Sequence, residues 1–433
     1  MRRRGFFNGL LLLAAFLVIA PAAPARPDTG AFSPKIDARL TEGLAQRRVE
    51  RRPDGTARKV AAGRYNGVTF AFVDDEVILV SSRPAEVKTF AERWRGKILK
   101  RIHWPDTREK VRDLYLLKLD ISAPPAGVFN REDNRVAVSD ARALALLKIV
   151  TSEHAQGHKL GLNLLTKPTD ILAGVSMEGG PPGGFKTNAA LWDYIRRGGP
   201  LDVDVIDAWR AIAMTGKLNN KVQAAIIDQG FGLNESGFDE VDWKGGAKLY
   251  HSSDDTPADD NFSWHGSHSA DAFGAAADDG EGAVGPAGPV AGQMQLIPSG
   301  YTLLGMASAL MDAYATGAPI ISLSLSIEFP QTGAASILSS LAPLEDFESA
   351  TGSMYTYKNR LIFAAAGNGG TNVDTMDGDE EMVWWFPCEN TGVICVNGWA
   401  GAKETALYGS NPSSLSNWGE GKGDTVDIGG PLT

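Results

Sequence analysis

Short apolar segments alternate with helical patterns along the chain from residue 202 onward. Apolar residues recur at helical spacing in two of these segments, Val205 to Met214 and Thr302 to Thr316, and Gly317 follows the second as a stop signal. The apolar runs that predict strands are Val222 to Asp228, Val290 to Pro298, Pro319 to Leu325, Leu361 to Ala366 and Val393 to Gly398. This alternation predicts an α/β domain with a parallel sheet and helices on both faces.

A different pattern precedes that domain. The stretch from Thr69 to Ser82 is apolar but interrupted by Asp74, Asp75 and Glu76, so it predicts two short strands or one bent strand. Two helices are predicted at Glu86 to Trp94 and Ser139 to His154, and two strands at Gly96 to Trp104 and Asp113 to Asp120. The order strand, helix, strand, strand, helix is most of a ferredoxin-like α+β unit.

These patterns divide the chain into five parts. Residues 26–65 have little periodicity and predict a flexible, exposed leader. Residues 66–165 hold the α+β unit. Residues 166–201 predict a linker because they include the stretch Gly179-Gly-Pro-Pro-Gly-Gly184. Residues 202–433 hold the α/β domain.

The first 25 residues have the three regions of a secretory signal peptide. Arg2, Arg3 and Arg4 form the basic region, Gly9 to Ala20 is the apolar region, and Ala23-Pro24-Ala25 supplies the small residues of a cleavage site. Cleavage is expected after Ala25. The apolar region is too short for a typical membrane span. We therefore expect a secreted or periplasmic protein that has no membrane attachment after cleavage.

Composition narrows the classes of partner. The 433 residues are 43% hydrophobic and 22% charged, which suffices for a large core in two or three domains. The formal charge of −10 argues against a nucleic acid or an anionic membrane surface as the main partner. The only cysteines are Cys388 and Cys395. Export permits a disulfide between them, and two separate buried thiols are the alternative.

The first candidate for chemistry is Asp228, at the end of the apolar run from Val222 to Ile227. A carboxylate at the carboxyl end of a buried parallel strand stands where open α/β sheets place their ligand-binding crevices. Gly230 and Gly232 let the backbone turn away beside it. An ordinary turn that ends a strand is the alternative interpretation.

The second candidate is His265, which begins the stretch His-Gly-Ser-His-Ser-Ala-Asp-Ala-Phe-Gly-Ala-Ala-Ala. Small residues let a helix lie close to a sheet, which would fix the imidazole at the start of the helix. A histidine oriented by a carboxylate is a general base for a nucleophile. Two alternatives remain: a histidine with a local hydrogen-bond partner, and a metal site formed with His268. No pattern nearby supplies further metal ligands.

The third candidate is Asn368, which follows the apolar strand pattern after Arg360. An amide at such a strand end can donate a hydrogen bond to an oxygen that becomes negative during acyl transfer. An asparagine in a left-handed turn is the alternative.

Together and in this order, the motifs Asp-x-Gly, His-Gly-x-His and Ala-Ala-Gly-Asn resemble those of the subtilisin-like serine proteases (subtilases, peptidase family S8). The resemblance extends from about Asp202 to Thr433 and includes Ile320 to Ser326, Phe386-Pro and Leu415-Ser-Asn-Trp-Gly. It implies a subtilisin-like fold that hydrolyses peptide bonds, with proteins or peptides as substrates. The implied roles are Asp228 as triad acid, His265 as base and Asn368 as oxyanion donor, with Ser324, Leu325 and Ser326 lining the substrate cleft.

This sequence departs from the family pattern at three places. Gln229 stands where the family usually has Ser or Thr, and Ser326 stands where it usually has Gly. No Gly-Thr-Ser-Met segment follows Asn368. We expect the nucleophilic serine to lie beyond Thr433, and residues 1–433 by themselves to be inactive. The alternative is a catalytically inactive subtilase-like protein with a binding or inhibitory function.

The resemblance also implies a role for the α+β unit, as a pro-segment that acts in cis on the peptidase domain of a zymogen. No cofactor is required for the implied catalysis, and no catalytic metal ligand is assigned. Structural calcium is a family habit, with acidic loops at Asp254 to Asp260 and Asp374 to Glu381 as candidate sites. Neither loop has EF-hand spacing.

Overall fold

The computed structural model describes most of the chain outside its first 31 residues. Described are residues 32–42, 44, 49–52, 54–65, 67–104, 112–126, 128, 131–168, 203–231, 248–249, 263–275, 277, 285–330, 342–368, 370, 372–373, 383–399, 416 and 426–431. Within these ranges, every helix is too short or too polar to cross a bilayer. The predicted signal peptide, residues 1–25, lies outside the described residues.

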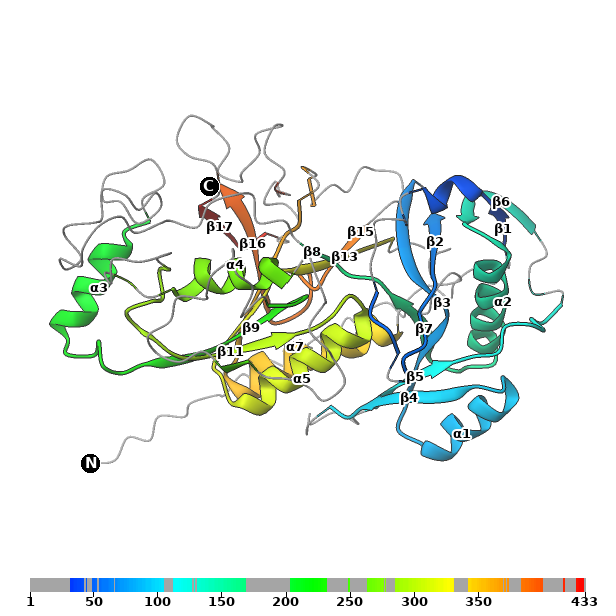
Figure 1. The fold of residues 1–433 in the computed structure, drawn as a ribbon, viewed down its shortest axis with the longest axis horizontal. Helices are drawn as coiled ribbons and strands as arrows, with labels where there is room; N and C mark the ends of the chain where they lie inside the picture. Colours follow the sequence, from blue (N-terminus) through cyan, green and yellow to red (C-terminus); the bar gives the residue numbers. More distant parts are fainter. Residues whose placement is uncertain are drawn as a thin grey trace, which may run out of the picture.

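Seven parallel strands form the central sheet of the C-terminal part, in the order β10-β11-β9-β12-β14-β16-β17 (Figure 1). The strands are β9 (Val222–Asp228), β10 (Lys248–Leu249), β11 (Ala291–Pro298), β12 (Ile320–Leu323), β14 (Leu361–Ala365), β16 (Val393–Trp399) and β17 (Ile428–Pro431). β9 is buried without interruption from Ala224 to Asp228, as its apolar sequence predicts for an inner strand. The predicted α/β fold class is confirmed.

Helices cover both faces of this sheet. They are α3 (Val205–Met214), α4 (Ser263–Gly274), α5 (Leu303–Thr316) and α7 (Ala342–Lys358). α4 and α5 contact β9 and β11 and lie on opposite sides of them (Figure 1). α5 begins where the Thr302 hydroxyl accepts a hydrogen bond from the amide of Gly305, and it ends at Gly317, whose φ is 81°.

The N-terminal unit is a second sheet, in the order β1-β6-β2-β3-β5-β4, with β7 paired to β3. Its elements are β1 (Phe32–Ile36), η1 (Ala38–Thr41), β2 (Val60–Tyr65), β3 (Val68–Ser81), α1 (Pro84–Arg93), β4 (Lys97–Ile102), β5 (Asp113–Lys118), β6 (Arg131–Val138), α2 (Ala141–Ala155) and β7 (Leu160–Leu164). The antiparallel strands β7, β3, β5 and β4 with α1 and α2 make the predicted ferredoxin-like arrangement.

Two expectations about the N-terminal unit need correction. Residues 26–65 are not simply a flexible leader, because β1 and β2 lie within them and pair in the sheet. Their polar composition concealed this, since Arg52 is buried by ion pairs with Asp75 and Glu76. The same acidic residues do not split β3 into two strands, because partners from elsewhere in the unit neutralise them.

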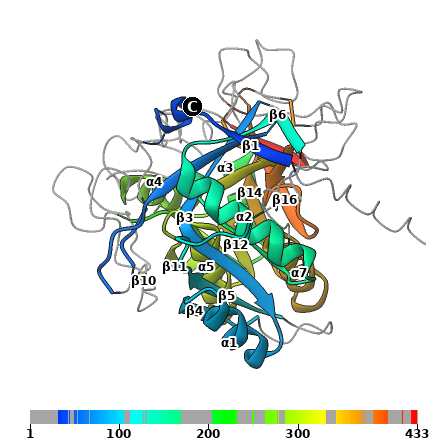
Figure 2. The same cartoon turned by 90° about the vertical axis from the view of Figure 1, so that its right-hand side faces the viewer.

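The two units share an interface in which α5 and α7 lie between the sheets (Figures 1 and 2). Its apolar part includes the rings of Phe70 and Phe329, whose centroids are 5.3 Å apart. At one border Asp346 of α7 faces Arg112 at 3.9 Å. Burial raises the pKa of Asp346, and the charges of Arg112 and Lys159 oppose that rise.

A small third sheet connects the units. It has the order β15-β13-β8, from β15 (Val383–Phe386), β13 (Leu325–Pro330) and β8 (Lys167–Pro168). β8 falls at the start of the predicted linker, residues 166–201, so the first residues of that segment are an ordered strand. Residues 169–201 lie outside the described residues.

Candidate active site at the end of the central sheet

Asp228 ends β9, and its side chain is completely buried. Its backbone carbonyl accepts hydrogen bonds from the Ser299 amide at 2.7 Å and the Ser299 hydroxyl at 3.0 Å. The amide of Gln229 donates to Oδ1 of the carboxylate at 2.7 Å. The carboxylate is therefore fixed at the carboxyl edge of the sheet, where the sequence predicts a functional acid.

The structure brings His265 into direct contact with Asp228. Nδ1 of His265 lies 2.7 Å from Oδ1 of Asp228, and the imidazole is 1% exposed. Because a carboxylate only accepts hydrogen bonds, the hydrogen between them is on Nδ1. Nε2 of the neutral ring is then the acceptor nitrogen, which is the tautomer that a general base needs.

A close approach of two backbones sets this contact. The amide of Gly266 in α4 donates to the carbonyl of Gly230 at 3.1 Å. A Cβ atom at Gly266 would lie 2.2 Å from that oxygen and 2.9 Å from the ring of Phe231. Glycine is therefore required at position 266, because any side chain would push α4, and the imidazole at its start, away from β9.

The other predicted residues lie at the same edge of the sheet. Ser324 and Leu325 follow β12, whose neighbour is β9, and the amide of Ser324 is 3.4 Å from the carbonyl of Ile227. Leu325 and Ser326 are buried at the start of β13. Asn368 is half-buried beyond the carboxyl end of β14, two strands from β9. All the predicted side chains therefore lie near one rim, and Asp228 and His265 are the two in a printed hydrogen-bonded contact.

The segment around β8 lies against the predicted cleft-lining strand. Pro168 pairs with Leu325 and Lys167 pairs with Ser326 in antiparallel register. On its other side, the amide of Thr166 donates to the carbonyl of Tyr301 at 2.9 Å, and Leu165 bridges Thr302. The chain from 165 to 168 thus runs between the start of α5 and the start of β13. Sequence patterns did not indicate this, because two residues are too few for a strand signal.

Cys388 and Cys395 are joined by a disulfide, with their Cα atoms 4.8 Å apart. The bond ties the turn after β15 to β16. It lies in a small apolar cluster with Ala366 and Trp385, close to the end of β14 from which Asn368 projects.

The described residues offer little for a metal ion. No group of three His, Cys, Asp or Glu residues within them has the arrangement of a metal site, which leaves the pair His265 and His268 without a third ligand there. Burial lowers the pKa of His268, and the neighbouring His265 lowers it further. The two loops considered for calcium, 254–260 and 374–381, lie outside the described residues.

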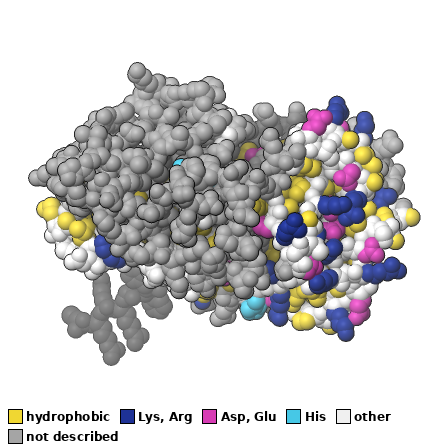
Figure 3. All heavy atoms as spheres, in the orientation of Figure 1, with side chains coloured by type: hydrophobic (Ala, Val, Ile, Leu, Met, Phe, Trp, Pro, Cys, Tyr) yellow, Lys and Arg dark blue, Asp and Glu magenta, His cyan; other side chains and the backbone are white. Residues whose placement is uncertain are grey.

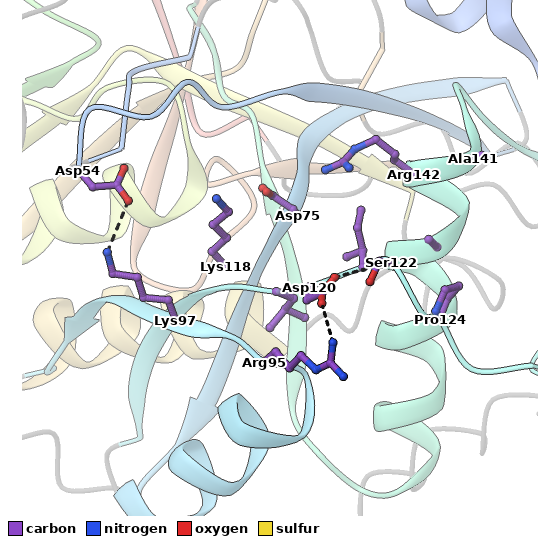
Figure 4. A pocket seen from close by; sticks show the side chains of 13 residues that line it. Asp54, Asp75, Arg95, Lys97, Lys118, Asp120, Ser122, Pro124, Ala141 and Arg142 are labelled. Carbon is purple, nitrogen blue, oxygen red and sulfur yellow. Dashed lines mark hydrogen bonds and ion pairs between the residues drawn. The ribbon is translucent and has the colours of Figure 1, made fainter.

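A pocket of about 780 Å³ opens in the N-terminal unit, away from β9 and α4 (Figure 4). Its basic side chains have acidic partners: Lys97 lies 3.5 Å from Asp54, and Arg95 lies 3.7 Å from Asp120. The charges of its wall therefore largely neutralise one another, and the wall contributes nothing to the Asp228 and His265 pair.

Comparison with known proteins gives the family. Residues 219–422 match the subtilase family model. No curated protein sequence matches the chain. Among solved structures, the epidermin leader peptide processing serine protease EpiP from Staphylococcus aureus is 12% identical, with a TM-score of 0.47 over 82% of this chain and 74% of that chain. The nisin leader peptidase NisP from Lactococcus lactis is 19% identical, with a TM-score of 0.35 over 49% of this chain and 62% of that chain.

The predicted family is thus confirmed for the part of the chain that carries Asp228, His265 and Asn368. Residues 219–422 belong to the subtilase family of serine proteases.

Proposed function

We propose that this protein is an exported subtilisin-type endopeptidase made as a zymogen. The observation that carries the proposal is the buried hydrogen bond between Nδ1 of His265 and Oδ1 of Asp228. In the proposed reaction, Asp228 holds the imidazole, Nε2 takes the proton of a serine hydroxyl, and the serine oxygen attacks the peptide carbonyl. Asn368 donates to the oxyanion. The nucleophilic serine is expected beyond residue 433.

Nε2 then returns its proton to the leaving amine, and water hydrolyses the acyl-enzyme by the same general-base route. The substrate is a protein or peptide that adds as a strand to the backbone of Ser324, Leu325 and Ser326. The burial of the acid and base supports this chemistry, because a water-poor site strengthens the electrostatic interactions on which the reaction depends.

The N-terminal unit acts as the pro-segment in cis, and the pairing of β8 with β13 supports this role. β13 begins next to Ile227 and leads away from Asp228. β8 is antiparallel to it, so the chain approaches Asp228 as it runs from Lys167 to Pro168. It thus occupies the backbone groups that a substrate strand would use. Activation requires cleavage on the C-terminal side of Pro168, and we expect the mature chain to begin between residues 169 and 201.

Charge also supports a partnership between the two parts of the chain. Residues 26–168 contain 27 Lys and Arg against 18 Asp and Glu, whereas residues 169–433 contain 12 against 34. Basic side chains are spread over the described surface of the N-terminal unit among acidic and hydrophobic ones (Figure 3). Opposite net charges attract the cleaved pro-segment to the peptidase domain, and added salt should weaken that attraction.

The test is active-site labelling of the full-length protein, including whatever follows residue 433. We expect a fluorophosphonate probe to label it and peptide substrates to be cleaved. His265→Ala should abolish both, and Asp228→Asn should lower kcat by about 10⁴-fold. The matched control is Ser308→Ala, a buried α5 residue remote from β9, which should retain activity.

Three results would count against this proposal. A stop codon directly after codon 433 would favour the inactive binding or inhibitory protein. Activity that a chelator removes, without probe labelling, would favour a metal-dependent hydrolase. N-terminal sequencing that finds residue 26 still attached to fully active enzyme would exclude the pro-segment role.

A further inference from the structure

The second oxygen of the Asp228 carboxylate has its own hydrogen-bond donor. The bonds to Oδ1 come from Nδ1 of His265 and the amide of Gln229. The hydroxyl of Ser269 donates to Oδ2 at 2.7 Å. Because the carboxylate is fully buried, each oxygen depends on protein donors and not on bulk water.

Ser269 and His265 lie on the same helix. They are four residues apart on α4, about one turn, so their side chains project from the same face of the helix. The contact of Gly266 with Gly230 sets the distance of that face from β9. One rigid element therefore supplies a donor to each oxygen of the carboxylate.

The side chain next to the acid does not take this role. The Gln229 amide nitrogen points to the hydroxyl of Thr166, at 3.4 Å, and its Oε1 has no hydrogen-bond partner among the described residues. Residue 229 thus serves Asp228 only through its backbone amide, and its side chain contacts the segment that leads into β8. The hydroxyl that orients Asp228 comes from α4.

We propose that Ser269 is a positioning residue of the peptidase centre, whose hydroxyl holds the Asp228 carboxylate in the plane where Oδ1 receives the Nδ1 hydrogen of His265. The inference rests on the proposed function for its catalytic meaning. Without the hydroxyl, Oδ2 is left buried without this donor, and the carboxylate can turn away from the imidazole. Transition-state stabilisation of the imidazolium then falls, while substrate contacts along β13 are unchanged.

The charged surroundings define the expected pH effect. The titratable groups of α4 near the pair are His268 and Asp271, and the described strands packed against the helix, β9 and β11, add only Asp228 itself. Burial lowers the pKa of His268, so it is neutral at pH 7 and brings no positive charge. A donor on Oδ2 stabilises the pair more while it is negative than after it has gained a proton. Removing the donor should therefore raise the pH at which the pair becomes protonated.

The first experiment compares Ser269→Ala and Ser269→Thr with Ser308→Ala in the full-length enzyme. Ser269→Ala should lower kcat about 10-fold or more with little change in KM, and should move the acid limb of the kcat profile to higher pH. Ser269→Thr, which keeps the hydroxyl, should restore both. If the Thr variant unfolds at lower temperature, Ser269→Cys takes its place, with an intermediate effect because a thiol is a weaker donor.

A purely structural role would lower the unfolding temperature of Ser269→Ala without moving the acid limb, and that result would overturn the proposal. Wild-type kcat in Ser269→Ala would overturn it as well. If even the wild type neither cleaves peptides nor binds the probe, the proposed function fails on its own. The positioning role is then decided by an NMR pH titration of the His265 ring. A midpoint that does not rise in Ser269→Ala, relative to Ser308→Ala, refutes it.

Discussion

The most informative single change is Glu76→Gln in the N-terminal unit. The Glu76 side chain is completely buried and accepts hydrogen bonds from Nε of Arg52 at 2.8 Å, Nε of Arg58 at 3.0 Å and Nδ2 of Asn163 at 2.8 Å. The substitution keeps the shape of the side chain but removes its negative charge. Two guanidinium groups, with side chains 3% and 10% exposed, then lose their shared partner.

Removing one partner of a buried ion pair costs about 3–5 kcal/mol. Arg52 keeps an ion pair with Asp75, and Arg58 keeps one with Glu50 at 3.5 Å, so the lower end of the range applies. We therefore expect the free energy of unfolding of the N-terminal unit to fall by about 3 kcal/mol. For a unit of this size, that lowers the unfolding temperature by roughly 10 °C.

The same network reaches the peptidase domain, so the change should also loosen the interface. The carboxylate of Glu50 accepts a hydrogen bond from the amide of Tyr301, and Oδ1 of Asn163 lies 3.5 Å from the amide of Leu304. Both amides are at the start of α5, next to the segment that pairs with residues 165–166. Weakening this contact should expose the stretch after Pro168 to added proteases.

The assay is urea denaturation followed by circular dichroism, together with timed limited proteolysis. The matched control is Glu92→Gln on α1, whose exposed carboxylate lies 3.8 Å from Lys88 and should change neither measurement. A loss below about 1 kcal/mol in Glu76→Gln, with a proteolysis rate like that of the control, would refute the account of the network.

Three further predictions concern other parts of the molecule. Because burial raises the pKa of Asp346 above its ordinary 3.8, the folded state keeps this proton longer, and the stabilisation present at low pH is lost as pH rises through that window. Asp346→Asn should therefore gain unfolding temperature relative to wild type between pH 4 and 7, and a constant difference would contradict this. Replacing Cys388 and Cys395 by Ser should lower the free energy of unfolding by about 2 kcal/mol, measured against the intact protein in urea. Gly266→Ala should lower kcat at least about 100-fold through the displaced imidazole. Gly274→Ala on the same helix meets only the flexible end of a methionine side chain, so it should be mild, and equal losses would refute the close-approach argument.

Much of the central sheet could be predicted from the sequence because its signals are local. The apolar run before Asp228 is long enough to identify a strand buried on both faces, and Thr302 and Gly317 mark the two ends of α5. Each of these patterns is complete within a few residues. The same holds for the small residues after His265, which indicate a helix pressed against a sheet.

The sequence by itself determined the family, the α/β class and the residues that could supply an acid, a base and an oxyanion donor. Only the tertiary structure decided how these side chains are supported and covered. The donor to the second carboxylate oxygen is 41 residues from Asp228, and Glu76 meets Asn163 across 87 residues. The strand at Lys167 and Pro168 exists only through its partner near residue 325. Such contacts join segments that carry no local trace of one another, because burial and hydrogen bonding depend on where the folded chain returns.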